Sequence, residues 1–239
     1  WPAGGGVFEP GRHRVCNGNK AGMKHRLSVD RVAVSLGKAR ILTGFSLDIG
    51  DGEMVGLIGR NGAGKTTLLK TVLGLLRPEG GDVQFDGRTM LGMPAHERVC
   101  LGIGYMPEDR GLVGALSVRQ NLAIPVWARG LHDLNARMEQ VCAMVPELHE
   151  FMDSPALSLS GGQQKLVALG RALMCGEKLL LLDEPFEGVS PVLSQRLVEA
   201  VGRARASGVS ILLAQSDRKG QASDFDRLIF IERGANVSD

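Results

Sequence analysis

The chain has 239 residues, of which 44% are hydrophobic and 23% charged, and its formal net charge is +2 at pH 7. This composition is typical of a globular protein, and the small net charge predicts no nucleic-acid partner. No apolar run reaches the roughly 18 residues that a membrane-spanning helix needs, so membrane association would require a partner. The length suits one large domain or two small ones.

The four cysteines, Cys16, Cys100, Cys142 and Cys175, lie far apart and form no C-x-x-C pair. Reduced structural thiols in a cytosolic protein are the expected interpretation. The five histidines are equally scattered and predict no metal site.

Residues 1–22 are rich in glycine and basic residues and show no apolar periodicity. They also lack the apolar segment of a signal peptide. Because Met23 resembles a natural start, we expect residues 1–22 to be a disordered or non-native segment.

Alternating apolar and polar residues predict two antiparallel strands, at 27–34 and 41–49, joined by a turn at Gly37-Lys38. The alternation in the first of these is imperfect. Further short elements are expected downstream: an apolar strand at 54–58, a helix from Thr67, a strand at 82–85, a helix from Pro94 to about Cys100, and a strand at 102–105.

The character of the chain changes between residues 108 and 155, where helical patterns replace strands. Ser117 can cap a helix that Pro125 is expected to kink, and two more amphipathic stretches follow at 134–145 and 147–152. Such an insertion between β–α units predicts a distinct helical subdomain.

After this insertion, strand and helix patterns alternate again. The expected elements are a helix opened by Ser160 and reaching Met174, an apolar strand at 178–182, a helix from Pro191 to about Ala206, and strands at 209–213 and 226–231, the last of the chain. The fold class is therefore α/β with a mainly parallel sheet and an N-terminal antiparallel β region. We expect residues 23–107 and 156–239 to form the core and 108–155 the helical subdomain.

Residues 59–66 match the phosphate-binding pattern G-x-x-x-x-G-K-[ST] between an expected strand and an expected helix. Glycines there let the backbone approach a ligand, and successive N–H groups form an anion-binding nest at a helix N-terminus. Lys65 is expected to reach the β- and γ-phosphates, and the Thr66 hydroxyl to hold Mg²⁺. A chance glycine-rich turn, the alternative, is expected in about one chain in a hundred of this length. The predicted nucleotide-binding residues are Gly59, Arg60, Asn61, Gly62, Ala63, Gly64, Lys65, Thr66 and Thr67.

Asp183 and Glu184 follow the apolar strand at 178–182 and so lie at the carboxyl edge of the sheet, where ligands bind in such folds. We expect Asp183 to hold Mg²⁺ through water, and Glu184 to orient or deprotonate the attacking water. Adjacent acids after a strand can also simply cap a helix. The phosphate loop in the same chain favours the catalytic interpretation.

Ser160-Gly161-Gly162 at a helix start is a second phosphate-binding device, with a hydroxyl, two permissive backbones and a helix dipole. On its own it is more often an ordinary helix N-terminus. One chain rarely needs two such devices for one nucleotide, so we expect each to serve a different copy in a symmetric dimer.

The three motifs, in this order, resemble those of the ATP-binding cassette (ABC) ATPases, the nucleotide-binding subunits of ABC transporters. Residues 59–67 resemble the Walker A motif, 159–163 the family signature, and 179–184 the Walker B motif with its catalytic glutamate. The resemblance runs from Arg26 to the C-terminus. It implies a P-loop NTPase core, Mg²⁺, and a head-to-tail dimer with ATP between the Walker A of one subunit and the signature of the other, here Ser160, Gly161, Gly162 and Gln163.

Within the family, residues 94–98, 104–108 and 184–191 look most like the subunits that serve importers of branched-chain amino acids and related polar solutes. That resemblance implies transmembrane permease subunits as partners and, indirectly, a solute-binding protein. It places the chain peripherally on the cytoplasmic face of the inner (plasma) membrane.

Three positions depart from the family pattern. Glu108 replaces the glutamine of the Q-loop and can still approach Mg²⁺ or its water. Ser216 replaces the switch histidine and can donate a hydrogen bond but carries no positive charge. Leu36 replaces the aromatic residue that stacks on adenine, a contact worth roughly 1–3 kcal/mol per base in single-stranded nucleic acid.

We therefore expect an ATP-hydrolysing subunit of an importer, with Glu184, Glu108 and Ser216 catalytic and Thr66, Glu108 and Asp183 at the metal. Two alternatives stay open. One is a soluble ABC ATPase without a transport role, which the single cassette and the lack of a long coiled-coil insertion disfavour. The other is a regulatory subunit that binds ATP but hydrolyses it weakly, which Glu108 and Ser216 suggest.

Overall fold

The computed structural model describes residues 25–216 and 225–237, so the predicted segment 1–22 lies outside the described residues. The strands are β1 (His25–Leu36), β2 (Ala39–Gly50), β3 (Met54–Ile58), β4 (Gly80–Phe85), β5 (Arg88–Thr89), β6 (Ile103–Met106), β7 (Leu179–Asp183), β8 (Ser210–Gln215), β9 (Arg227–Glu232) and β10 (Ala235–Val237). The helices are α1 (Lys65–Val72), α2 (Ala95–Val99), α3 (Val118–Ala128), α4 (Leu134–Met144), α5 (Gly161–Leu173) and α6 (Pro191–Ala206), with short 3₁₀ turns η1 (Pro146–Phe151) and η2 (Ala156–Ser158).

The central sheet has the strand order β10-β9-β3-β8-β7-β6. Its neighbouring strands run parallel except for β9 and β10, which are antiparallel. Strands β3 and β7 are buried along their whole length, as expected of parallel strands covered on both faces. The predicted fold class, α/β with a mainly parallel sheet, is confirmed.

A second, antiparallel sheet has the order β2-β1-β4-β5. The imperfect alternation in β1 has a local cause, a bulge at Arg31, whose φ is +46°. The bulge shifts the register between Val29 and Val32: Leu27 and Val29, at odd positions, are buried before it, whereas Val32 and Val34, at even positions, are buried after it together with the small Ala33.

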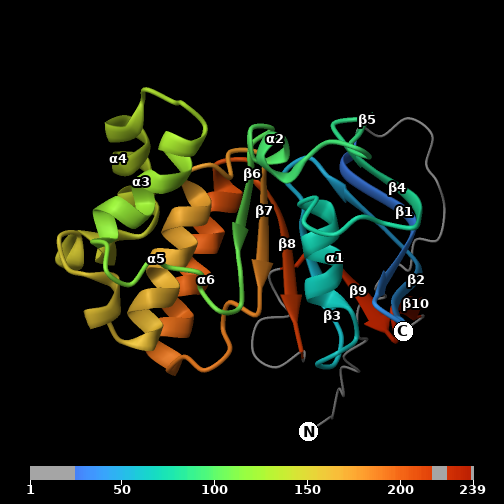
Figure 1. Ribbon diagram of the computed structural model, residues 1–239. Coiled ribbons are helices and arrows are strands. Elements are labelled where there is room, and N and C mark those ends of the chain that lie inside the picture. The colour runs from blue at the N-terminus through green and yellow to red at the C-terminus, as the bar shows by residue number, and fades with distance from the viewer. Residues whose placement is uncertain (1–24, 217–224, 238–239) are drawn as a thin grey trace, which may run out of the picture.

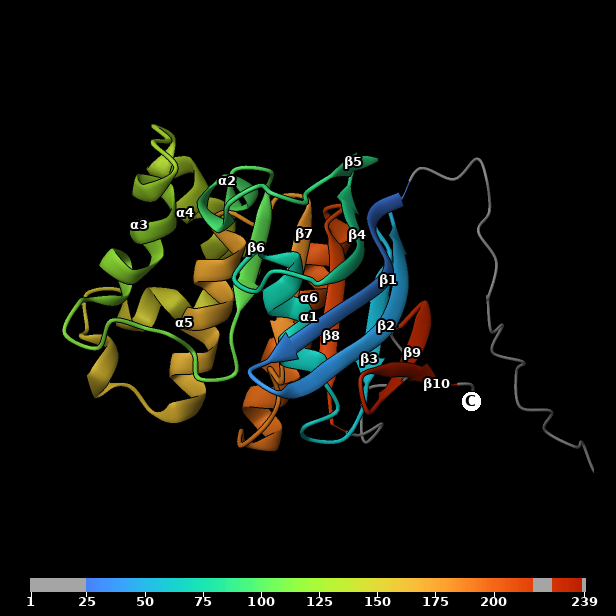
Figure 2. The ribbon, with the colours of Figure 1, turned by 45° about the vertical axis from the view of Figure 1, so that its right-hand side comes forward.

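The central sheet separates two apolar cores. On one face, Leu180 and Leu182 of β7 pack in the core formed with helices α3 to α6. On the other face, Leu179 and Leu181 pack in the core formed with α1 and the antiparallel sheet. Figure 1 shows α3 to α6 on one side of β6, β7 and β8, and Figure 2 shows the long pair β1 and β2 passing beside α1 and β3.

The segment predicted to be a helical subdomain contains α3, α4 and η1. Ser117 caps α3 through a reciprocal pair of hydrogen bonds with Gln120, and the helix continues through Pro125. The proposed boundaries of this subdomain stay a prediction. Among the described residues, no helix is both long and apolar enough to cross a bilayer.

The prediction that residues 226–231 form the last strand is wrong, because β10 follows β9 as the second arm of a hairpin. Arg233 and Gly234 between them have φ values of +49° and +78°, the conformation that joins antiparallel strands tightly. β10 and β5 are too short to show an alternating pattern, which is why the sequence did not reveal them.

Candidate nucleotide site

The predicted phosphate loop connects the carboxyl end of β3 to the first turn of α1. Gly59 lies against β9, where a Cβ would come within 2.4 Å of the carbonyl oxygen of Ile231. Gly64 takes φ +112° as the N-cap of α1, and no side chain caps the helix. The first N–H groups of α1 therefore lack a side-chain acceptor, which is the arrangement that binds an anion at a helix N-terminus.

Lys65 lies inside this loop and is only 6% exposed. Its ammonium donates to the carbonyl oxygens of Gly59 at 2.5 Å and Arg60 at 3.2 Å. It also forms an ion pair with Glu184, with Nζ 3.0 Å from Oε1. One cation thus links the phosphate loop to the predicted catalytic carboxylate.

Three neighbouring parallel strands bring together two of the three predicted catalytic residues, Glu184 and Ser216, whereas Glu108 follows β6 and is exposed. In the register of β3, β8 and β7, Ile58 is paired with Gln215, and Ala214 with Asp183. Glu184 and Ser216 come directly after these positions and meet at the carboxyl edge of the sheet. Figure 1 shows these three strands side by side.

Ser216 contacts both Glu184 and the phosphate loop. Its hydroxyl lies 2.5 Å from Oε1 of Glu184 and 2.6 Å from Oδ1 of Asn61, and its backbone N–H donates to Oε2 of Glu184 at 3.2 Å. The serine, which carries no charge, therefore orients the glutamate through hydrogen bonds.

Asp183 is fully buried, and its Oδ1 has no hydrogen-bond partner in the described structure. Burial raises its pKa, and the charges of Glu108 and Glu184 add to that rise, while a hydrogen bond with Thr66 opposes it. A divalent cation would coordinate the free Oδ1 and offset the electrostatic cost of burying the Asp183 carboxylate near two other acidic residues. Thr66, Asp183 and the exposed Glu108 thus fit a Mg²⁺ site completed by phosphate oxygens.

No cluster of three or more His, Cys, Asp or Glu that could hold a metal by itself occurs in the described ranges. A site with one hydroxyl and few carboxylates suits Mg²⁺, which usually keeps water and binds substrate phosphates.

Ser160 and Gln163 form a reciprocal capping box at the start of α5. The Ser160 hydroxyl accepts from the backbone N–H of Gln163, and the Gln163 side chain accepts from the backbone N–H of Ser160. Ser160 and Gly161 are exposed. Within the described residues, the hydrogen bonds of this capping box stay at the start of α5 and do not reach the phosphate loop of the same chain.

The two glycines of this motif differ in their surroundings. A Cβ on Gly162 would lie 2.1 Å from Cδ1 of Leu193 at the start of α6, whereas one on Gly161 would meet only the flexible end of Arg110, at 3.2 Å. A side chain at position 162 would therefore force Leu193 to move, whatever contact Gly162 makes with a nucleotide.

We expect Gly162→Ala to lower the free energy of unfolding by about 1–3 kcal/mol, because the added methyl group overpacks the α5–α6 contact. Urea denaturation followed by circular dichroism measures this. Gly161→Ala is the matched control and is expected to stay within about 0.5 kcal/mol of the unmodified protein. Equal losses in both variants would contradict this assignment.

Leu36, predicted to contact adenine, ends β1 and is 46% exposed. Such an apolar side chain at the surface is available for contact with a base but offers no π-face.

Two residues at the site were missed from the sequence. Lys165 on α5 donates to the carbonyl oxygen of Glu184 at 2.7 Å, and the hydroxyl of Tyr105 donates to Oδ2 of Asp183 at 3.4 Å. Burial, and then Asp183, raise the pKa of Tyr105 well above its usual range, so Tyr105 stays a protonated donor. The available signal was a lysine among the apolar residues of α5 and a tyrosine in β6, next in the sheet to the strand that carries Asp183.

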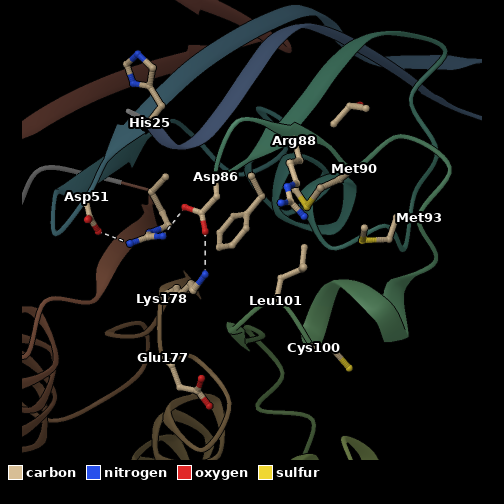
Figure 3. Close-up of a pocket in the computed structure, with 13 residues that line it drawn as sticks. His25, Asp51, Asp86, Arg88, Met90, Met93, Cys100, Leu101, Glu177 and Lys178 are labelled. Carbon is tan, nitrogen blue, oxygen red and sulfur yellow. Dashed lines mark hydrogen bonds and ion pairs between the residues drawn. The ribbon is translucent and has the colours of Figure 1, made fainter. Parts of the chain in front are cut away.

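A cavity of about 660 Å³ lies elsewhere, at the amino ends of the central strands. Four of its charged side chains pair with one another: Arg26 with Asp51 and Asp86, and Lys178 with Asp86 (Figure 3). Lys178 directly precedes the five residues of β7, and Asp183 ends that strand. At about 3.3 Å per residue, roughly 16 Å separate the cavity from Asp183 at the carboxyl edge of the sheet.

A family model described as ABC transporter matches residues 42–187, more than half of the chain, including the phosphate loop and Glu184. The chain belongs to the ABC transporter family. It is an ATP-binding cassette ATPase, which confirms the resemblance inferred from the three motifs.

This cassette is 36% identical over 211 residues to the high-affinity branched-chain amino acid transport ATP-binding protein BraG of Pseudomonas aeruginosa, covering 88% of the chain and 91% of the relative. It is 31% identical over 210 residues to the lipopolysaccharide export system ATP-binding protein LptB of Escherichia coli, covering 87% of each.

Solved structures give the same result for the fold. One is a nucleotide-free ATP-binding cassette from an ABC transporter, with a TM-score of 0.80, 25% identity and 90% coverage of both chains. Another is the ADP conformation of an ATP-binding cassette of an ABC transporter, with a TM-score of 0.80 and 26% identity, again covering 90% of both chains.

Proposed function

We propose that this cassette is the ATP-binding and ATP-hydrolysing subunit of an ABC importer, coupling ATP-driven dimer closure to solute uptake. The observation that carries the proposal is the convergence of Lys65, Glu184 and Ser216 at the carboxyl edge of the central sheet. A phosphate loop with a buried cation, a carboxylate and a hydroxyl within hydrogen-bonding distance suits hydrolysis of a phosphoanhydride.

In the proposed reaction, the β- and γ-phosphates of ATP bind the loop N–H groups and Lys65. The phosphate then competes with Glu184 for the Lys65 ammonium, which frees Glu184 to orient or deprotonate the attacking water. Ser216, already bonded to both oxygens of Glu184, keeps the carboxylate aimed at that water.

Thr66, Asp183 and Glu108 would hold Mg²⁺, which supplies charge neutralisation at the phosphates when it is bound. Glu108, at the Q-loop position, adds a negative charge beside the γ-phosphate, and this lowers the expected rate relative to a glutamine.

The proposed dimer places Ser160, Gly161 and Gln163 of a second ATP-binding subunit over the nucleotide held by the first. The exposed positions of Ser160 and Gly161 support this, since they are available to a partner. Leu36 would contact the adenine.

The similarity to BraG supports branched-chain amino acids, or a related polar solute, as the cargo. In that role the cassette would bind transmembrane permease subunits at the cytoplasmic face of the inner membrane. A solute-binding protein would supply the solute to those permease subunits. The similarity to LptB supports export as the competing direction.

Purification of the full chain from membranes of its native host, followed by identification of its partners, tests this proposal. Recovery with permease subunits and a solute-binding protein of the amino-acid type is the expected result. Recovery with soluble partners only would overturn the transport role, and partners of an exporter would overturn the direction. ATP binding without turnover would favour the regulatory subunit.

A further inference from the structure

Lys165 is a buried cation whose ammonium group contacts the main chain of Glu184. It lies on the second turn of α5, is 3% exposed, and its Nζ donates to the Glu184 carbonyl oxygen at 2.7 Å. It follows the exposed cap residue Ser160 by five positions, roughly 7.5 Å along the helix axis. The same short piece of helix therefore carries both the signature motif and this contact.

The ammonium group is not needed for packing. In the described part of the chain Lys165 forms no ion pair, and burial lowers its pKa, while Glu187, Glu184 and Glu108 oppose that fall and Arg110 adds to it. Burying a cation without a paired carboxylate costs free energy, and a methionine would fill the same space without that cost. The charge is useful only through the hydrogen bond that it makes.

That hydrogen bond acts on a strained residue. Glu184 has φ +47°, a left-handed backbone conformation that non-glycine residues rarely adopt. Its N–H donates to the carbonyl oxygen of Ala214 at 3.0 Å, and its carbonyl oxygen accepts from Lys165 and, at 3.2 Å, from the N–H of Glu187. Hydrogen bonds therefore hold both the N–H and the carbonyl oxygen of Glu184. The left-handed backbone conformation that they maintain sets the direction of the Glu184 side chain.

We propose that Lys165 is a positioning residue for Glu184, tying the signature end of α5 to the backbone of the catalytic glutamate in the same subunit. The inference rests on the proposed function, in which the signature of this subunit contacts ATP bound to a second one. When the signature contacts that ATP, a shift of α5 moves the Lys165 ammonium and, through its hydrogen bond, the backbone of Glu184. Each subunit thereby senses the nucleotide of its partner at its own catalytic group.

The test compares steady-state ATP hydrolysis of Lys165→Met and Lys165→Arg with the unmodified protein. Lys165→Met is expected to lower kcat by roughly 10–100-fold with KM for ATP changed by less than about threefold, because a misplaced base costs up to about 10²-fold. Lys165→Arg keeps a donor and is expected to recover most of kcat.

Arg137→Met is the matched control. Arg137 on α4 is also a long, largely buried cation that donates to a main-chain oxygen of the same region, that of Met174 just beyond the other end of α5, at 3.2 Å. Its loss is expected to change kcat by less than about twofold. A tenfold or larger loss there would show that any loosening of α5 slows turnover, and would overturn the inference.

A second measurement separates positioning from general damage to the fold. In a Glu184→Gln background, residual hydrolysis of radiolabelled ATP is followed over hours with and without Lys165→Met. If Lys165 acts through the Glu184 carboxylate, the second substitution adds no further loss. Additive losses, or a Lys165→Met variant as active as the unmodified protein, would overturn the inference. An unmodified protein without ATP turnover would overturn the proposed function, and this inference with it.

Discussion

Glu184→Gln is expected to lower ATP turnover by about 10²–10⁴-fold, the usual contribution of a general base, while ATP binding is retained. Glutamine keeps the shape of the side chain and its hydrogen bond with Ser216, but it cannot take a proton from water. It also no longer competes as an anion for Lys65, so that ATP should bind as tightly or more tightly. Steady-state hydrolysis and equilibrium binding of ATP, measured on the same preparation, check both parts.

Glu187→Gln is the matched control for this variant. Glu187 is exposed, and its backbone N–H donates to the Glu184 carbonyl oxygen, a hydrogen bond that the substitution leaves in place. Its turnover is expected to stay within about twofold of the unmodified protein. Unchanged turnover in Glu184→Gln would remove Glu184 from the reaction. A stable ATP-bound dimer in Glu184→Gln, detected by gel filtration, would support closure before hydrolysis.

The central sheet could be predicted because its strands are buried on both faces. Runs such as 54–58 and 179–182 carry no polar side chain, and the parallel direction of their strands followed from the helices between successive strands. β10 could not be predicted, because its position depends on β9, and three residues carry too little pattern. The bulge at Arg31 was visible only as a break in alternation, since the backbone conformation that causes it is not a property of one residue type.

The catalytic edge could be predicted only in part. Asp183 and Glu184 were placed there because they follow a buried strand, and the phosphate loop because its motif follows another. The contact of Ser216 with Glu184 joins residues 32 positions apart and depends on β7 and β8 being neighbours in one register. Strand order is a long-range property, so the sequence identified the participants but not their hydrogen bonds.

Gly162 and Lys165 show why motif residues need a structure before a role is assigned. Gly162 was expected to bind nucleotide, and the structure adds a packing role, since a Cβ there would meet Leu193 of α6 in the same chain. Lys165 lies just past the signature and was given no role, although its ammonium reaches the backbone of Glu184. Both positions are set by the way α5 packs on its surroundings.

Lys65→Met is expected to lower ATP turnover by at least about 10²-fold, because it removes a preorganised cation from the phosphates. It should also destabilise the nucleotide-free protein by about 3 kcal/mol, since it leaves the Glu184 carboxylate, whose side chain is only 9% exposed, without its cation. The double variant Lys65→Met/Glu184→Gln removes both charges and should regain most of that stability but none of the activity. Urea denaturation in the absence of nucleotide, with hydrolysis measured in parallel, separates the two effects. A double variant that is less stable than Lys65→Met alone would contradict the prediction that the Lys65–Glu184 ion pair stabilises the nucleotide-free protein.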